Sequence, residues 1–124
     1  MRWPSGAARS SDGAAERYEA ARTAAYETLF DLELQQGRHA HVVSELGGLL
    51  RTTPFNERFC EQLMVALYRS GRQTEALDTF LQMQRRLQTD IGVLPSPTLR
   101  RHQQAILTHD PIISRNGSFV TLRG

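Results

Sequence analysis

Apolar residues recur every three to four positions along most of the chain, the spacing that places them on one face of an α-helix. This pattern predicts five helices, over residues 15–36, 39–52, 55–70, 73–89 and 97–108. Gly37 and Gly71 follow the first and third of these segments, and Pro54 follows the second. Glycine ends helices because it adopts the left-handed conformation, and proline because it cannot continue the hydrogen-bond ladder. The sequence therefore predicts an all-α protein.

The first predicted helix carries two adjoining apolar stripes, and the later helices carry one each. The first stripe is Tyr18, Ala21, Ala25, Leu29 and Leu32, and beside it lie Tyr26, Phe30 and Leu34. An amphipathic helix buries such a stripe against its neighbours. The inward-facing positions that we expect in the later helices are Val42, Val43, Leu46, Leu49, Leu50, Phe59, Leu63, Ala66, Leu67, Ala76, Leu77, Phe80, Met83, Leu87, Leu99, Ile106 and Leu107, with Cys60, Met64 and Tyr68 widening the third stripe.

Two Gly-Arg pairs, Gly37-Arg38 and Gly71-Arg72, lie 34 residues apart, and the apolar positions of residues 27–51 coincide with those of residues 61–85 at the same offset. A helix–turn–helix unit of about 34 residues is the period of tetratricopeptide repeats. Such hairpins stack because each covers an apolar face that its neighbour cannot bury alone. The same step beyond Gly71 reaches Ala105, in the middle of the fifth helix. We therefore expect two stacked tetratricopeptide-like helical hairpins plus a C-terminal capping helix, which together form an α-α superhelix.

The two ends of the chain differ from this pattern. Residues 1–14 are rich in glycine, serine and alanine, so we expect a flexible leader before a domain over residues 15–108. The tail, residues 109–124, contains Asn116-Gly117, a signal for a β-hairpin turn. A lone hairpin is marginally stable, so the tail is expected to be a hairpin or disordered.

Composition excludes several classes of protein. The formal net charge is only +2, and all 15 basic residues are arginine, so charge alone does not indicate binding to nucleic acid or to a membrane. The single cysteine, Cys60, excludes an internal disulfide and falls in an apolar run, where it should act as a small hydrophobic residue. No signal peptide or membrane-spanning segment is recognisable, which predicts a cytoplasmic protein.

The sequence predicts neither an enzyme nor a cofactor-binding protein. "ELGGLL" lacks the lysine and the spacing of a phosphate-binding loop, and we expect Gly47 and Gly48 to allow close approach of two helices. His41 and Glu45 have the spacing of a metal-binding pair on a helix, but a third ligand is missing, so no metal site is expected.

Candidate contact residues fall into two groups. By analogy with stacked repeats, the first helix of each hairpin lines the concave face. Its exposed residues would be protein-contact candidates, although Tyr68 could instead complete the core. The basic residues near the chain's end are nucleic-acid candidates, although nearby acidic residues and the absence of interleaved aromatic residues favour a solvated helix face. The protein-contact candidates are Glu27, Asp31, Gln35, Arg58, Glu61, Val65, Tyr68 and Arg69, and the nucleic-acid candidates are Arg85, Arg86, Arg100 and Arg101.

Two segments, "ALYRSGRQTEAL" at residues 66–77 and "IGVLPSPTLRRHQQAIL" at residues 91–107, closely resemble the bacterial transcriptional activator domain of SARP-type regulators. The resemblance extends over residues 15–107. It implies a tetratricopeptide-like domain that regulates transcription through oligomerisation, as in a homodimer, or through contacts with RNA polymerase or sigma subunits. In that family a separate N-terminal winged-helix domain reads DNA, and nothing before Ala15 is long enough to encode one.

Two other functions stay open. The chain could be a stand-alone tetratricopeptide-like adaptor that binds a peptide or protein outside transcription. It could also bind nucleic acid directly through Arg85, Arg86, Arg100 and Arg101. The target promoter, any ligand and the oligomeric state leave no trace in the sequence.

Overall fold

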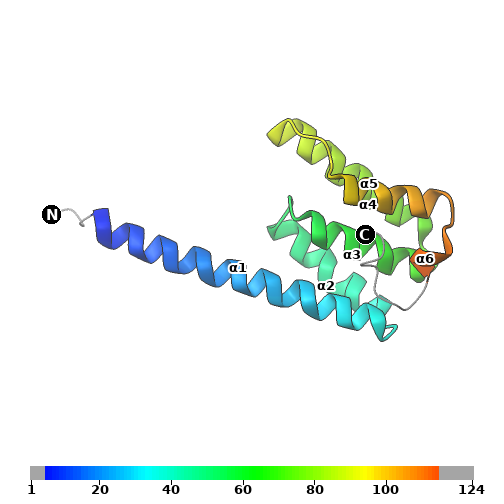
Figure 1. Ribbon diagram of the computed structural model, residues 1–124, viewed down its shortest axis with the longest axis horizontal. Coiled ribbons are helices and arrows are strands. Elements are labelled where there is room, and N and C mark those ends of the chain that lie inside the picture. The colour runs from blue at the N-terminus through cyan, green and yellow to red at the C-terminus, as the bar shows by residue number, and fades with distance from the viewer. Residues whose placement is uncertain (1–4, 115–124) are drawn as a thin grey trace.

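The computed structural model describes residues 5–114, with side chains from residue 13 onward. This part of the chain consists of helices joined by short loops and contains no strand, as predicted (Figure 1). The elements are α1 (Ser5–Gln35), α2 (His39–Thr52), α3 (Glu57–Arg69), α4 (Gln73–Arg86), the π-helical turn η1 (Leu87–Ile91), α5 (Pro97–Leu107) and α6 (Pro111–Ser114).

Local signals in the sequence set several helix ends. Asn56 precedes α3, and its side-chain oxygen accepts a hydrogen bond from the Phe59 N–H at 2.9 Å. Ser96 precedes α5 and accepts one from the Leu99 N–H at 3.1 Å. These side chains satisfy N–H groups that have no partner within the helix. Gly37 and Gly71 adopt φ values of 79° and 78°, the left-handed conformation that ends a helix without strain on a β-carbon.

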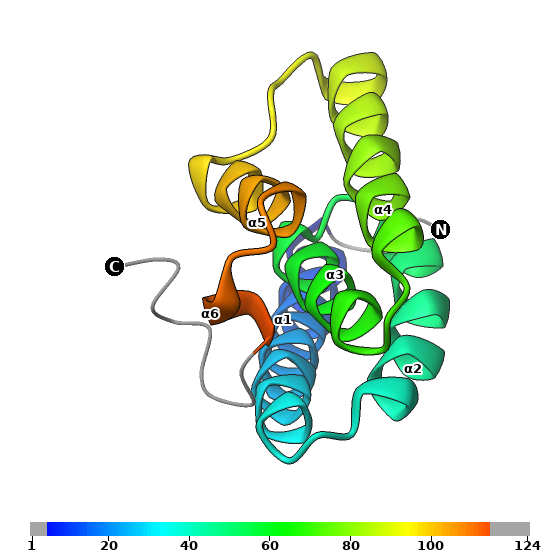
Figure 2. The ribbon, with the colours of Figure 1, turned by 90° about the vertical axis from the view of Figure 1, so that its right-hand side faces the viewer.

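Helix α3 lies at the centre of the molecule and contacts α1, α2, α4, α5 and α6. Figure 2 shows α2 and α4 on one side of α3, with α5 and α6 on the other. Helices α1 and α2 form the first hairpin, α3 and α4 the second, and α5 packs on both α3 and α4. This arrangement confirms the two tetratricopeptide-like hairpins and the capping helix.

The core forms where these helices meet. The Phe30 and Phe59 rings, from α1 and α3, meet edge to face with centroids 6.0 Å apart, a favourable geometry for aromatic pairs. The other large side chains that are fully buried are Leu34, Leu46, Met64, Phe80, Met83, Leu99, Ile106, Ile113, His102 and Gln62.

Two expectations about burial were wrong. On α1 the stripe with Phe30 and Leu34 enters the core, whereas the stripe with Leu29 and Leu32 stays 46% and 49% exposed. Only one stripe of α1 faces α2 and α3, so the second has no neighbour within the described chain. Leu107 is 50% exposed because α5 instead packs Leu99, Ala105 and Ile106 inward.

Helix α1 begins at Ser5, not at Ala15, so most of the segment expected to be a flexible leader is helical. Alanine is the strongest helix former, and the segment contains Ala7, Ala8 and Ala14. This first half of α1 extends beyond the other helices (Figure 1), and residues 14–22 are all exposed.

The start of the tail is also helical. Asp110 accepts a hydrogen bond from the Ile112 N–H at 3.0 Å, and α6 follows at once. Ile113 is fully buried where α6 contacts α3 and α5. Asn116-Gly117 lie outside the described residues. Among the described helices, none has an apolar segment long enough to cross a membrane.

Candidate protein-interaction surface

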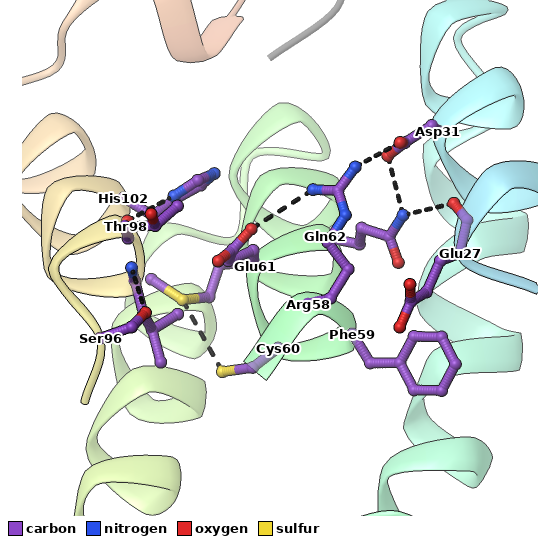
Figure 3. A network of polar contacts seen from close by, with 12 residues as sticks. Glu27, Asp31, Arg58, Phe59, Cys60, Glu61, Gln62, Ser96, Thr98 and His102 are labelled. Atoms are coloured by element: carbon purple, nitrogen blue, oxygen red, sulfur yellow. Dashed lines mark hydrogen bonds and ion pairs between the residues drawn. The ribbon is translucent and has the colours of Figure 1, made fainter. Parts of the chain in front are cut away.

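A network of polar side chains joins α1 to α3 (Figure 3). The Gln62 side-chain amide donates hydrogen bonds to the Glu27 backbone carbonyl at 2.7 Å and to Asp31 Oδ1 at 2.8 Å. Arg58 donates to the other Asp31 oxygen and to Glu61 Oε1, the latter at 3.3 Å. Four of the predicted protein-contact residues, Glu27, Asp31, Arg58 and Glu61, therefore lie in one network, in which Arg58 binds Asp31 and Glu61. Gln62, which we did not single out, links them.

Burial limits what this network can offer a partner. Glu61 is 4% exposed and Val65 is fully buried, so the expectation that they line an exposed face was wrong. Both face inward because α3 is surrounded by five other helices. The Arg58 side chain is 17% exposed and the Asp31 side chain 30%. The network accordingly fixes the first hairpin on the second and leaves only an edge at the surface.

Tyr68 and Arg69 also serve the fold. The Tyr68 hydroxyl lies 2.9 Å from Nδ1 of His109, and its ring packs partly buried against the core. Arg69 donates hydrogen bonds to the carbonyl of Ile113 at 2.8 Å and to that of Leu34 at 3.4 Å. Burial lowers the pKa of the Arg69 guanidinium. A role for either residue in a protein contact stays a prediction.

A groove runs between α2 and α4. Two hollows, of about 310 and 230 Å³, share Gly47, Leu63, Thr79 and Gln82 as lining residues and so form one continuous depression, here called the α2–α4 groove. Leu63 of α3 belongs to the core beneath it. A groove between two helices with an apolar floor can accept a peptide segment or a helix.

Gly47 leaves the α2 backbone bare toward this groove. A β-carbon placed on Gly47 would meet no atom within 4 Å, and one on Gly48 would meet only the end of the Arg51 side chain, at 3.7 Å. The expectation that these glycines allow close approach of helices within the fold was therefore wrong. A glycine inside a helix costs about 1 kcal/mol relative to alanine. The Gly-Gly pair, which was interpreted differently from the sequence, is the signal that could have pointed to this surface.

The ends of the α2–α4 groove differ in charge. Arg51 and Arg86 line the hollow at one end, and Glu75 and Asp78 line the hollow at the other. At the acidic end Arg72 binds both carboxylate oxygens of Glu75, at 2.6 and 2.7 Å. This hydrogen-bonded pair raises the pKa of Arg72 and lowers that of Glu75. A bound segment would therefore be oriented by its own charges.

The predicted nucleic-acid residues lie on two elements. Arg85 and Arg86 line a hollow of about 430 Å³ together with Gln82, Thr89 and Asp90. Arg100 and Arg101 are exposed near the start of α5, where Arg101 donates a hydrogen bond to the Thr98 hydroxyl at 3.2 Å. Asp90 adds negative charge to the first site, which weakens its attraction for phosphate.

Two further kinds of site concern metal ligands, at His41 and Glu33, and a reactive thiol, at Cys60. His41 Nε2 lies 3.2 Å from Glu33 Oε2, and within residues 13–114 no three histidine, cysteine, aspartate or glutamate side chains form a metal-binding group. The Cys60 sulfur is buried, 3.9 Å from the Met64 sulfur and from the Thr79 carbonyl oxygen. Burial raises the pKa of the Cys60 thiol, which keeps it in the unreactive thiol form.

Known proteins share both the sequence and the fold. The family described as the bacterial transcriptional activator domain (BTAD) matches residues 5–107. The chain is 49% identical over 88 residues to the regulatory protein AfsR of Streptomyces coelicolor, which covers 71% of this chain and 9% of AfsR. It is 41% identical over 101 residues to the regulatory protein DnrI of Streptomyces peucetius, which covers 82% of this chain and 37% of DnrI.

A solved structure of EmbR from Mycobacterium tuberculosis, in complex with a low affinity phosphopeptide, superposes with a TM-score of 0.80 at 30% identity. The match covers 89% of this chain and 29% of that chain. The chain thus spans well under half the length of these relatives. The match over most of its residues shows that this chain belongs to the bacterial transcriptional activator domain family, together with SARP-type regulators.

Proposed function

We propose that this chain is a non-catalytic regulatory and protein-interaction domain of a SARP-type transcriptional activator. It regulates transcription through oligomerisation or through contacts with the transcription machinery, and a separate winged-helix domain reads DNA. Its relatives are named as regulatory proteins, and the similar EmbR structure is a complex with a peptide. Both observations support a protein partner.

The α2–α4 groove is the observation that carries this proposal. Its apolar floor at Leu63 and its uncovered backbone at Gly47 would receive an apolar side chain or a helix. Arg51 and Arg86 line one end of the groove. At the other end Arg72 pairs with Glu75, which leaves Asp78 as the negative charge without an ion-pair partner among the described residues, and this difference in charge would orient the bound segment. The residues of the α1–α3 network are largely committed to one another, so the groove is the better surface for a partner.

Binding of purified RNA polymerase holoenzyme and of its sigma subunit to the immobilised chain tests the proposal. We expect Gly47→Trp, which fills the groove, to weaken binding at least about tenfold, since about 1.4 kcal/mol of contact energy is lost. The matched control is Ser44→Trp on the same helix, because Ser44 is exposed and lies outside the groove lining.

The outcomes separate the candidate functions. Binding that Gly47→Trp weakens and Ser44→Trp preserves supports the proposal. Equal binding by both variants moves the polymerase contact away from the groove. No binding to either the holoenzyme or sigma contradicts the contact with transcription machinery and favours the stand-alone adaptor, which would use the same groove for another peptide.

A further inference from the structure

The outer face of α1 is an apolar surface that no described residue of the chain covers. Tyr18 is 67% exposed, and Leu29 and Leu32 are 46% and 49% exposed. A soluble monomer usually leaves large apolar side chains exposed singly, whereas a contiguous exposed patch marks an interaction site. We call this surface the outer stripe; it comprises Tyr18, Ala21, Ala25, Thr28, Leu29 and Leu32, all of which are exposed.

The spacing of the outer stripe is that of a coiled-coil seam. Tyr18, Ala21, Ala25, Thr28 and Leu32 follow one another at alternating intervals of three and four residues, the heptad pattern. The residues of α1 that enter the core, Phe30 and Leu34, lie on the opposite side of the helix at 3.6 residues per turn. Helix α1 therefore has two apolar faces, of which the fold uses one.

The position of α1 makes a helical partner physically reasonable. Its first half extends beyond the other helices (Figure 1), and residues 14–22 are exposed on all sides. A helical segment without tertiary contacts is marginal in water even when it is rich in alanine. A second helix along the outer stripe would supply the missing contacts.

We propose that α1 pairs with α1 of a second copy of this chain, antiparallel and along the outer stripe. In the register that follows, Ala21 lies opposite Ala25 of the other copy, and Tyr18 lies opposite Thr28. The small side chains at the centre allow the two backbones to approach closely, and the larger ones pack toward the ends. The rest of each molecule lies on the far side of its own α1, so the two bodies stay apart.

Charge complementarity favours a second copy over an unrelated helix. This register places Arg17 beside Asp31 of the other copy, and two-fold symmetry makes the same ion pair twice. The Asp31 side chain is 30% exposed even though it binds Arg58, so one edge of it can be reached. Arg22 would approach its own symmetry mate, but it is drawn aside by Glu19, at 3.5 Å, and by the Tyr26 ring, whose centroid lies 5.2 Å away.

This inference deepens the oligomerisation part of the proposed function and does not depend on the α2–α4 groove. Sedimentation of the intact chain measures it first. We expect a concentration-dependent dimer, and we expect Leu32→Glu to raise the dissociation constant by about 100-fold, roughly tenfold for each copy. Leu81→Glu is the matched control, because Leu81 is 42% exposed but lies on α4. It should leave the dissociation constant unchanged.

Disulfide cross-linking then tests the register independently of any loss of stability. Ala21→Cys and Ala25→Cys, mixed under oxidised glutathione, should form a disulfide between two chains, whereas neither variant alone should. A parallel pair would cross-link each variant to itself. The unaltered chain is the blank, because buried Cys60 should not react.

A monomer at all accessible concentrations overturns the inference and means that another protein covers the outer stripe. A dimer that Leu32→Glu leaves intact, or self-linked single variants, overturns it as well. Loss of the dimer in Leu32→Glu together with the mixed disulfide supports it. Polymerase binding measured on the same variants shows separately whether the groove proposal holds, because Leu32 lies outside the groove lining.

Discussion

Gln62 shows how one buried side chain can join two hairpins. It is fully buried in α3, and its amide donates to the backbone of Glu27 and to the carboxylate of Asp31. A buried acceptor that loses its donor pays its full desolvation cost. The polar network therefore stabilises the fold, because each buried polar group in it needs its hydrogen-bond partner to offset the cost of desolvation.

We expect Gln62→Met to lower the free energy of unfolding by about 1–3 kcal/mol, because the side chain keeps its volume but leaves two acceptors without their donor. Urea denaturation followed by circular dichroism measures the change. Gln82→Met is the control, since Gln82 is exposed and should change stability by less than about 0.5 kcal/mol. Equal effects at both positions would contradict the importance of this network.

Replacing Gly47 or Gly71 with alanine should change the stability of the protein in opposite directions. Gly47 lies in a helix interior with open space where a β-carbon would go, so Gly47→Ala should stabilise the protein by up to about 1 kcal/mol. Gly71 has φ +78°, a conformation in which a β-carbon is strained, so Gly71→Ala should destabilise it by about 1 kcal/mol or more. Thermal unfolding of both variants gives the two signs directly. A destabilising Gly47→Ala would mean that α2 needs its glycine for folding.

At the residue scale, the sequence showed which side chains are polar or charged, but not how deeply each of them is buried. Glu27, Asp31, Arg58 and Glu61 were expected to be exposed contact residues, and the structure instead places them in one polar network between α1 and α3. The sequence did not predict that Glu61 would be buried. Helical periodicity gives the face on which a residue lies, but not how many neighbours surround the helix.

At the scale of elements, the short helix α6 contributes more than its length suggests. Ile113 is fully buried, and its backbone carbonyl accepts a hydrogen bond from Arg69 of α3. Removing a buried isoleucine side chain down to alanine usually costs about 2–5 kcal/mol, from lost apolar burial and the cavity left behind.

We expect Ile113→Ala to lower the free energy of unfolding by about 2 kcal/mol or more, measured by urea denaturation. Ile112→Ala is the control on the same turn, because Ile112 is only partly buried, and its effect should be clearly smaller. If the two variants behave alike, α6 does not dock as described.

The elements whose ends carry a local signal were predicted most accurately. Gly37 and Gly71 follow the helices that they were predicted to end, and both adopt the left-handed conformation. The Asn56 cap was not predicted, and α3 begins at Glu57, two residues after the predicted start. The early start of α1 has no such signal, because Gly6 and Ser10 are weak helix formers that their alanine-rich surroundings outweigh. Helix α6 could not be predicted, since it depends on packing against α3 and α5. The π-helical turn η1 contacts only α4, which directly precedes it, and no residue pattern distinguishes it from a continuation of that helix.

At the scale of the whole molecule, the fold class follows from the 34-residue repeat, whereas the position of a binding surface does not. The α2–α4 groove and the outer stripe of α1 can be located only once the hairpins are stacked. The net charge of the whole chain is only +2. Strong binding to DNA requires several phosphates to be neutralised together.

We therefore expect little DNA binding by this chain alone. Replacing Arg85, Arg86, Arg100 and Arg101 together with glutamine should leave any measured DNA affinity, and its dependence on salt concentration, unchanged. Fluorescence anisotropy with a labelled duplex at several salt concentrations measures both. A fall in affinity with a shallower salt dependence would instead establish direct phosphate contacts by these residues.

The hydrogen bonds of Arg69 have a consequence for how the protein comes apart. Repeat proteins in which each unit touches only the next can open from one end while the other end stays folded. Here a single guanidinium on α3 binds the carbonyl of Leu34, at the end of α1, and that of Ile113, in α6. Neither end can leave without breaking a bond to the centre, so amide protons in the last turn of α1, in α3 and in α6 should exchange with solvent at similar rates, as one cooperative unit.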